Sequence, residues 1–495
     1  MLKRGLVPRQ GGTQEVQLNL DNRGWVDVRS GEWRFRTSGV TNITGHLEVA
    51  LGAIMHFYDA GPQPLALGST IHIGEQGAVI CREMNQDSLL LDGLKVFGDG
   101  TFHLGGTSLS RLTHEGSVAI ENFGFSSGAL AGPGRLTIAK SCHWSGGAMD
   151  GSGVTGIGPD ADLTIEGPEA KSLRERTLRN AGLADWSGTG MLTGSTATWH
   201  NLPGSRFAFR ATGALKRFNT ALKLVNEGLI TRGGTYQEVE FNLENRSRVE
   251  VLSGEWRLRA SEITNLGHIE VGDQAIVHAW DAGLPLVLGG VVSRFGGTGT
   301  AAIDGRIDNH GLIDVMSGTL EFRRGLTSQP RTTIGGPNAG TGFGQLSLQG
   351  NVSLGGLLQI VRDPIFAPAP GQQFSVLTAT PSLTGQFAAV SGRAAGNGQQ
   401  FDAVHNPNAA TVVVQASSTA AEPLLASLSS PEWKAGQMTL GITGCAGVVV
   451  VIESSNDLNA WETVATFTLG DAPAQFVDQA AARHPKRYYR FAAKR

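Results

Sequence analysis

Residues 14–36 read QEVQLNLDNRGWVDVRSGEWRFR, and residues 237–259 read QEVEFNLENRSRVEVLSGEWRLR. They belong to a longer repeat, in which residues 5–42 align without a gap on residues 228–265 and 22 of the 38 positions are identical. The similarity continues through GHLEV (45–49) and GHIEV (267–271), so we treat 5–70 and 228–292 as two related arrays. An internal repeat of this kind indicates a fold made of stacked copies of one unit.

A shorter unit runs inside the arrays and has the form Asn-x-Gly-apolar-apolar-acid-apolar, often followed by Ser-Gly. Copies begin at Asn22, Asn42, Asn226, Asn245, Asn265 and Asn309. Most neighbouring copies lie about 20 residues apart, which is the length of one solenoid coil.

Apolar and polar residues alternate within each coil, and this period of two predicts β-strands with one buried face. The 69 glycines supply the sharp corners between strands. We therefore predict an all-β protein, a parallel β-helix (solenoid) followed by a small C-terminal β-sandwich. A propeller or a large sandwich is the alternative architecture. Trp33 and Phe35 in the first array, and Trp256 and Leu258 in the second, should point into the core at equivalent positions of distant coils.

The pattern divides the chain into four predicted segments. The solenoid covers 1–330, and 331–415 is a β segment that terminates it by covering the last coil. The small and polar stretch 416–422 is a linker. A C-terminal β-sandwich domain follows over 423–495.

Charged residues at the outward positions predict two stripes along the solenoid. The first strand of each coil carries an acid and the next strand carries arginine, which indicates stripes that lie side by side and exchange salt bridges; two independent solvated faces are the alternative. The acids are Asp27, Glu48, Glu250, Glu270 and Asp314, and the arginines are Arg34, Arg36, Arg257, Arg259, Arg323 and Arg324.

Composition excludes several functions. A net charge of −3 and the lack of Lys/Arg runs argue against nucleic acid as a partner. No apolar run is long enough for a transmembrane helix. Cys81, Cys142 and Cys445 have neither disulfide nor zinc spacing, and no motif for a cofactor or metal is found.

Two parts of the chain resemble known families. LAGPGRLTIAKSCHWSGGAMDGSGVTGIG (130–158), with RTLRNAG and WHNLPGSRFAF further on, resembles the Gly-rich repeats of secreted bacterial adhesin-like β-helix proteins, which are filamentous and similar to autotransporter passengers. SSNDLNAW, FVD and HPKRYYRF in 423–495 resemble a C-terminal domain of secreted Verrucomicrobia and Planctomycetes proteins. The resemblance implies a non-enzymatic structural or adhesive role, at the cell surface or outside the cell, with surface glycans or surface proteins as partners.

Two other functions stay open. Parallel β-helices also include polysaccharide lyases and glycosidases, which need two carboxylates in one cleft. The nearest local cluster here is Asp304, Asp308 and Asp314, with His310. A glycan-binding module would present tryptophan rings at its surface, and Trp25, Trp186 and Trp280 are candidates.

The alignment also gives an expectation about the start of the reading frame. Because the similarity begins in the middle of a coil, we expect the natural chain to extend upstream and to carry a signal peptide.

Overall fold

The structure is a computed structural model. It describes all residues except 1, 4–5, 10, 18–19, 38–40, 60–64, 83–86, 108–109, 260–261, 281–285, 295, 325–328, 398, 407–410, 418–425, 435–436, 445–448, 457–459, 469–473, 485 and 495. Cys445 and most of the predicted linker lie outside the described residues.

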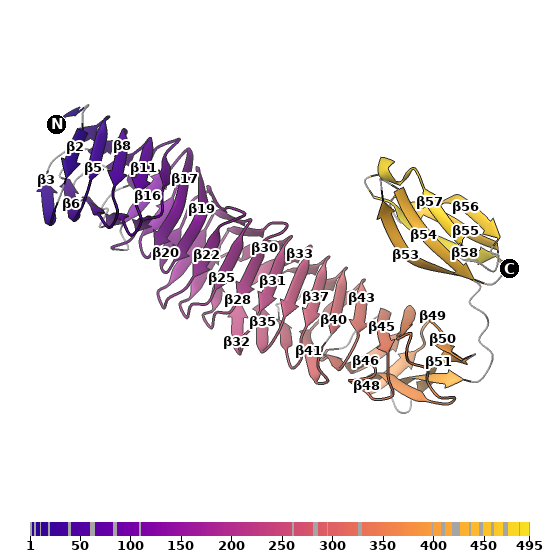
Figure 1. The fold of residues 1–495 in the computed structure, drawn as a ribbon. Coiled ribbons are helices and arrows are strands. Elements are labelled where there is room, and N and C mark those ends of the chain that lie inside the picture. Colours follow the sequence, from indigo (N-terminus) through magenta and orange to yellow (C-terminus); the bar gives the residue numbers. More distant parts are fainter. Residues whose placement is uncertain are drawn as a thin grey trace. The chain divides into compact units, whose positions relative to one another are not determined.

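The predicted solenoid is confirmed, with about 14 turns. Its short strands follow one another as a stack in Figure 1. Each coil contributes one strand to each of three parallel ladders, which we name ladders I, II and III.

Ladder I consists of β1 (Leu2–Lys3), β4 (Asp21–Asn22), β7 (Thr41–Ile43), β10 (Leu65–Leu67), β13 (Asp87–Leu90), β16 (Arg111–His114), β18 (Ala129–Ala131), β20 (Gly147–Met149), β23 (Lys171–Arg174), β26 (Leu192–Ser195), β29 (Leu215–Arg217), β32 (Tyr236–Val239), β35 (Glu255–Arg259), β38 (Ile276–Trp280), β41 (Thr300–Gly305), β44 (Thr319–Phe322), β46 (Gln345–Leu354) and β48 (Gln373–Gly385).

Ladder II consists of β2 (Leu6–Arg9), β5 (Trp25–Val28), β8 (His46–Val49), β11 (Thr70–Ile73), β14 (Lys95–Phe97), the first halves of β17 (Ser117–Phe125) and β19 (Arg135–Trp144), β21 (Val154–Ile157), β24 (Thr177–Asn180), β27 (Thr198–Asn201), β30 (Leu222–Asn226), β33 (Phe241–Asn245), β36 (Ile263–Asn265), β39 (Leu286–Leu288) and β42 (Ile307–Asn309).

Ladder III consists of β3 (Thr13–Gln17), β6 (Glu32–Thr37), β9 (Ile54–Asp59), β12 (Ala78–Arg82), β15 (Thr101–Leu104), the second halves of β17 and β19, β22 (Asp162–Ile165), β25 (Leu183–Trp186), β28 (Arg206–Phe209), β31 (Leu229–Arg232), β34 (Arg248–Val251), β37 (His268–Val271), β40 (Val291–Arg294), β43 (Leu312–Val315) and β45 (Gln329–Ile334).

Parallel pairing continues beyond residue 330, between β46 and β48 and between β47 (Leu357–Arg362) and β49 (Ala389–Ser391). The chain divides into two compact units. The first contains Met1–Val361, Ser375–Ser391 and His405–Val413, and the second contains Arg362–Phe374, Gly392–Val404 and Val414–Arg495. The predicted division at 330 and 415 stays a prediction.

In the second unit, six antiparallel strands form two three-stranded sheets. One contains β53 (Ala426–Lys434), β54 (Gln437–Gly444) and β57 (Ala474–Asp478), and the other contains β56 (Glu462–Thr468), β55 (Val449–Ser455) and β58 (Tyr488–Lys494). Apolar side chains of both sheets share one cluster: Leu440, Ile442, Val450, Ile452 and Phe476. This arrangement is compatible with the predicted β-sandwich. The other short strands are β50 (Ala394–Gly396), β51 (Gln399–Asn406) and β52 (Thr411–Ser417), and a 3-10 turn covers Ala481–Arg483.

The two sequence arrays do not occupy the same ladders. WVDV is β5 of ladder II, whereas the aligned RVEV is β34 of ladder III. EWRFR is β6 of ladder III, and EWRLR is β35 of ladder I. Since ten full coils and one further strand separate the arrays, the second array is displaced by one ladder.

The structure places all four predicted core residues in the interior. The exposed fraction is 5% for Trp33, 0% for Phe35, 1% for Trp256 and 3% for Leu258. The expectation that Trp33 and Trp256 hold equivalent positions is wrong, because Trp33 belongs to ladder III and Trp256 to ladder I.

Candidate functional site

A row of buried asparagines runs along one corner of the solenoid. The side-chain amide of each donates to the side-chain oxygen of the next, from Asn180 through Asn201, Asn226 and Asn245 to Asn265, over distances of 2.9, 2.8, 2.7 and 2.6 Å. Each amide also donates to the carbonyl of the first residue of a ladder III strand, as from Asn226 to Arg248. In the second array the repeated Asn is thus a corner residue that joins ladders II and III, whereas Asn22 and Asn42 of the first array lie on ladder I.

A fully buried arginine fastens the corner between ladders I and II. Arg176 donates to the carbonyls of Gly132 (3.1 Å) and Asp150 (2.9 Å) and to the Thr155 hydroxyl (2.8 Å), and it contacts Nε2 of buried His114. Burial lowers the pKa of Arg176 to about 10. Burial, followed by the Arg176 charge, lowers the pKa of His114 to about 4.

We expect His114 to make the solenoid sensitive to acid. An unfolded histidine takes up a proton near pH 6.5, whereas folded His114 stays neutral down to about pH 4. The unfolded state therefore binds more protons in this window, and stability falls as the pH is lowered from about 6.5 to about 4, with no further loss from this group below. Urea unfolding across this range should show that the free energy of unfolding depends less on pH in His114→Gln than in the wild type. Equal slopes would contradict this role.

The outward charges are arranged differently from the prediction, since each predicted stripe is divided between ladders. The acids Asp27 and Glu48 lie on ladder II, and Glu250, Glu270 and Asp314 lie on ladder III. The arginines Arg34 and Arg36 lie on ladder III, Arg257 and Arg259 on ladder I, and Arg323 and Arg324 directly after β44 of ladder I.

Charged groups pair within a ladder. In the structure the acids contact other bases and the arginines contact other acids: Asp27 with Arg29 (2.8 Å), Asp314 with Arg331 (3.7 Å), Arg34 with Glu32 (2.8 Å), Arg36 with Glu15 (3.2 Å), Arg257 with Glu255, Arg259 with Glu238 (3.5 Å), Arg323 with Glu321 (3.0 Å) and Arg324 with Asp304 (2.8 Å). These partners replace the predicted exchange between the two stripes, because a corner separates the strands that carry them.

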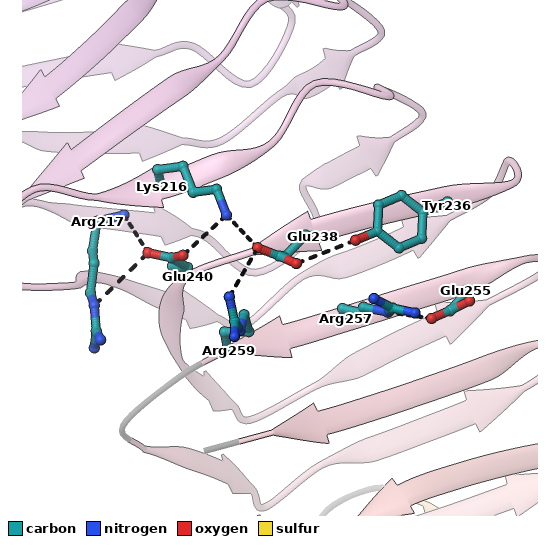
Figure 2. A network of polar contacts seen from close by, with 8 residues as sticks. All are labelled: Lys216, Arg217, Tyr236, Glu238, Glu240, Glu255, Arg257 and Arg259. Carbon is teal, nitrogen blue, oxygen red and sulfur yellow. Dashed lines mark hydrogen bonds and ion pairs between the residues drawn. The ribbon is translucent and has the colours of Figure 1, made fainter. Parts of the chain in front are cut away.

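Like charges that lie close together on a ladder are bridged by a cation. Glu250 and Glu270 are direct neighbours on ladder III, and Arg248 contacts both carboxylates, at 2.8 and 2.6 Å. On ladder I, Lys216 lies between Glu238 and Glu240 (Figure 2). The Lys216 ammonium holds the pKa of Glu238 below its usual range. Each of these four carboxylates therefore has a cationic partner, and such exposed pairs contribute little to stability individually.

The candidate catalytic cluster is not brought together. Asp304 lies on ladder I, Asp308 on ladder II and Asp314 on ladder III, so the three carboxylates face different sides of the solenoid. His310 pairs with Asp308 at 2.9 Å. Within the described ranges no group of three or more His, Cys, Asp or Glu side chains could hold a metal ion.

The three candidate surface tryptophans have different surroundings. Trp186 is fully buried, and the surroundings of the Trp280 side chain lie outside the description. Trp25 has 53% of its surface exposed on the outer side of ladder II.

Trp25 begins a row of side chains across four coils of ladder II, which we call the aromatic row: Trp25, His46, Glu48, His72 and Phe97. The ring centroids of Trp25 and His46 are 4.1 Å apart, and those of His72 and Phe97 are 5.0 Å apart. Glu48 joins the two halves, because its carboxylate contacts Nε2 of His46 (3.1 Å) and Nδ1 of His72 (2.6 Å). Phe97 is 40% exposed, so an open aromatic ring lies at each end.

Sequence reasoning missed most of this row, since only Trp25 and Glu48 were singled out. A signal was present in the repeat, where Trp25 aligns with Arg248 of the second array. At this outward position the second array has an arginine that makes two salt bridges, whereas the first array has an exposed indole.

A shallow groove of about 440 Å³ lies on the outer side of ladder III. Its floor includes the small residues Ala208, Thr231 and Gly233, and Leu183 and Leu252 are among its other lining residues. Asp185 and Arg210 in the groove pair with each other. The groove has apolar and paired polar groups but no aromatic ring among its lining residues.

The C-terminal motif residues form a buried polar cluster. Asp478 accepts from Arg487 (2.7 Å), the Tyr489 hydroxyl (2.8 Å) and the backbone N–H of Ala480 (2.8 Å). Burial alone would raise the pKa of Asp478, but these donors hold it below its usual range. Burial and the bond to Asp478 raise the pKa of Tyr489 to about 12. FVD and RYYR are therefore structural positions that join β57 to β58.

Asp478→Ala should destabilise the C-terminal sheets by about 1–3 kcal/mol, because it leaves buried donors without an acceptor. Hydrogen exchange of the full chain, followed by mass spectrometry, should show faster exchange in β57 and β58 and unchanged exchange in ladder II. Equal hydrogen-exchange rates of β57 and β58 in the wild type and the variant would contradict this assignment.

The chain matches no protein-family model and no curated protein. The part that the structure describes contains no helix long and apolar enough to span a bilayer. The roles of individual residues are therefore inferred from their contacts and exposure in the structure.

Proposed function

We propose that the chain is a non-enzymatic structural or adhesive segment of a secreted or cell-surface bacterial protein. The observation that carries the proposal is the aromatic row on a closed and well-packed solenoid. Its side chains are held by contacts with one another, and they leave Trp25 and Phe97 open to a partner. Side chains on a parallel ladder have fixed spacing, so such a surface is preorganised for binding.

Two further observations support this role. The ladders carry their charges in pairs, with cations that bridge neighbouring coils, so the lateral surfaces do not offer a strong field of one sign. The repeats resemble adhesin-like β-helices in their sequence. We place the protein outside the cell or at the cell surface on this resemblance.

The second candidate is a glycan-binding module, which the exposure of Trp25 favours. The third, a polysaccharide lyase or glycosidase, loses its best carboxylate cluster, because Asp304, Asp308 and Asp314 face different sides. The adhesive segment and the glycan-binding module would both use a surface that binds a partner without a chemical reaction.

The full chain should be incubated with plant and algal polysaccharides, with zinc and calcium added, while bound protein and new products are measured together. We expect the chain to sediment with some of these materials and to release neither reducing ends nor unsaturated sugars. Steady accumulation of either product would contradict the proposal and favour the enzyme.

A further inference from the structure

We propose that the aromatic row binds a neutral polysaccharide chain, with Trp25 and Phe97 as stacking platforms. This inference rests on the proposed adhesive function and names the ligand class of that surface. It goes beyond a general adhesive role, because it assigns the contact to five side chains on ladder II.

The spacing of the row suits an extended sugar chain. Trp25, His46 and Thr70 are register neighbours on successive coils, as are Glu48, His72 and Phe97. Neighbouring parallel strands lie about 4.8 Å apart, so the strands of Trp25 and Phe97 are separated by about 14 Å. One coil step is close to the length of one sugar unit in an extended polysaccharide, so the row would contact a few consecutive rings.

The chemistry of the row matches the two kinds of surface that a sugar ring presents. Apolar C–H faces of a pyranose pack on aromatic rings, and Trp25 and Phe97 are the exposed rings. Hydroxyl groups at the ring edge need donors and acceptors. Glu48 and His72 provide these between the two platforms. Both ring nitrogens of His46 are occupied, by Glu48 and by the Thr70 hydroxyl (2.7 Å), so His46 holds Glu48 in place.

The charges near the row favour a neutral ligand over an acidic one. Asp27 pairs with Arg29 at 2.8 Å, and Asp21 pairs with Arg23 at 3.4 Å. Lys95 is exposed at the register position next to Thr70, two strands along the ladder from Glu48, so the row carries one further acid and one further base. The surface has no excess of positive charge with which to attract a uronate or sulfate polymer.

A protein partner fits this surface less well. The centre of a protein interface is a contiguous apolar patch. Here the two aromatic rings are separated by a carboxylate and two imidazoles. We therefore argue for the glycan and treat a protein partner as an outcome of the test.

The second array supplies a matched variant. At the aligned position, on ladder III, Arg248 pairs with Glu250 two residues further on and with Glu270 of the next coil. In Trp25→Arg, the new side chain can pair with Asp27 and Glu48 in the same way, so the fold should be kept while the stacking platform is lost. Trp433→Arg makes the same exchange at an indole that is 56% exposed in the second unit, and it serves as the control.

The test is calorimetric titration of the full chain with cellohexaose, mannohexaose and, as an acidic probe, hexagalacturonate. We expect binding of at least one neutral hexasaccharide in preference to the acidic one, a loss of affinity of at least tenfold in Trp25→Arg and of a few fold in Phe97→Ala, and no change in Trp433→Arg. The urea midpoint of Trp25→Arg should match that of the wild type.

Three outcomes would overturn the inference: no binding of either neutral probe by the wild type, stronger binding of hexagalacturonate, or wild-type affinity in Trp25→Arg. Retention on isolated plant and algal cell walls, measured in parallel, separates this failure from failure of the adhesive function. If Trp25→Arg still adheres as the wild type does and the neutral hexasaccharides do not compete, the contact is made by another surface or by a protein. The adhesive function then stands and this inference does not.

Discussion

Replacing Trp256 by alanine is expected to lower the free energy of unfolding by about 3–5 kcal/mol, because a large side chain leaves a close-packed interior. The indole is 1% exposed, and its ring centroid lies 5.7 Å from that of Phe209 and 6.2 Å from that of Phe241. The indole N–H of Trp256 has no hydrogen-bond partner among the residues that the structure describes, so the stabilisation comes from packing. Urea unfolding followed by circular dichroism measures the change.

Trp256→Phe is the matched control for this prediction. It keeps an aromatic ring against Phe209 and Phe241 and removes no hydrogen bond, so it should cost clearly less than the alanine variant. Trp33→Ala, at 5% exposure on ladder III, should also be strongly destabilising. If iodide quenched the fluorescence of both indoles freely, their inward orientation would be wrong by one residue of register.

Replacing Asn226 by leucine should cost about 2–4 kcal/mol, because it leaves several buried polar groups with fewer partners. The change removes the bonds to Asn201, to Asn245 and to the Arg248 carbonyl. Leucine has the same branching and the same number of side-chain heavy atoms as asparagine, and it already occupies this place in the ladder at Leu288, so the corner accommodates its shape. The cost should therefore be polar in origin.

Leu288→Asn provides the reciprocal test. Leu288 lies in register between Asn265 and Asn309, so an asparagine there would extend the hydrogen-bonded row by one coil. We expect this variant to be neutral or slightly stabilising in urea unfolding. A neutral Asn226→Leu, or a strongly destabilised Leu288→Asn, would contradict the role given to the asparagine row.

The sequence predicts the coils well because their causes are local. Alternation of apolar and polar residues decides which side chains of a strand point inward, and glycine and asparagine mark the corners. The inward orientation of Trp33, Phe35, Trp256 and Leu258 needed only this alternation. The repeated Asn was visible as a fixed position at the start of each sequence unit, although its corner role and its hydrogen-bond partners were not.

The ladder to which a strand belongs could not be predicted, because it depends on every strand before it. β17 and β19 each pass from ladder II to ladder III as one continuous strand. Strands counted from the sequence are therefore assigned to the wrong ladder beyond this point. The predicted charge stripes are divided because the second array is displaced by one ladder. Asp304, Asp308 and Asp314 are divided because they lie on three consecutive strands, β41, β42 and β43, which belong to different ladders. The aromatic row has the same origin, since its five residues come from coils whose stacking register the sequence does not state.

The most direct test of the binding surface is hydroxyl-radical footprinting of the full chain, with and without a neutral hexasaccharide at saturation, read out by mass spectrometry. The account predicts that oxidation of Trp25 and Phe97 falls on binding. Exposed Trp433 should react equally in both samples, and buried Trp186 and Trp256 should be protected throughout. Unchanged oxidation of Trp25 in a sample that has bound the saccharide would contradict the account.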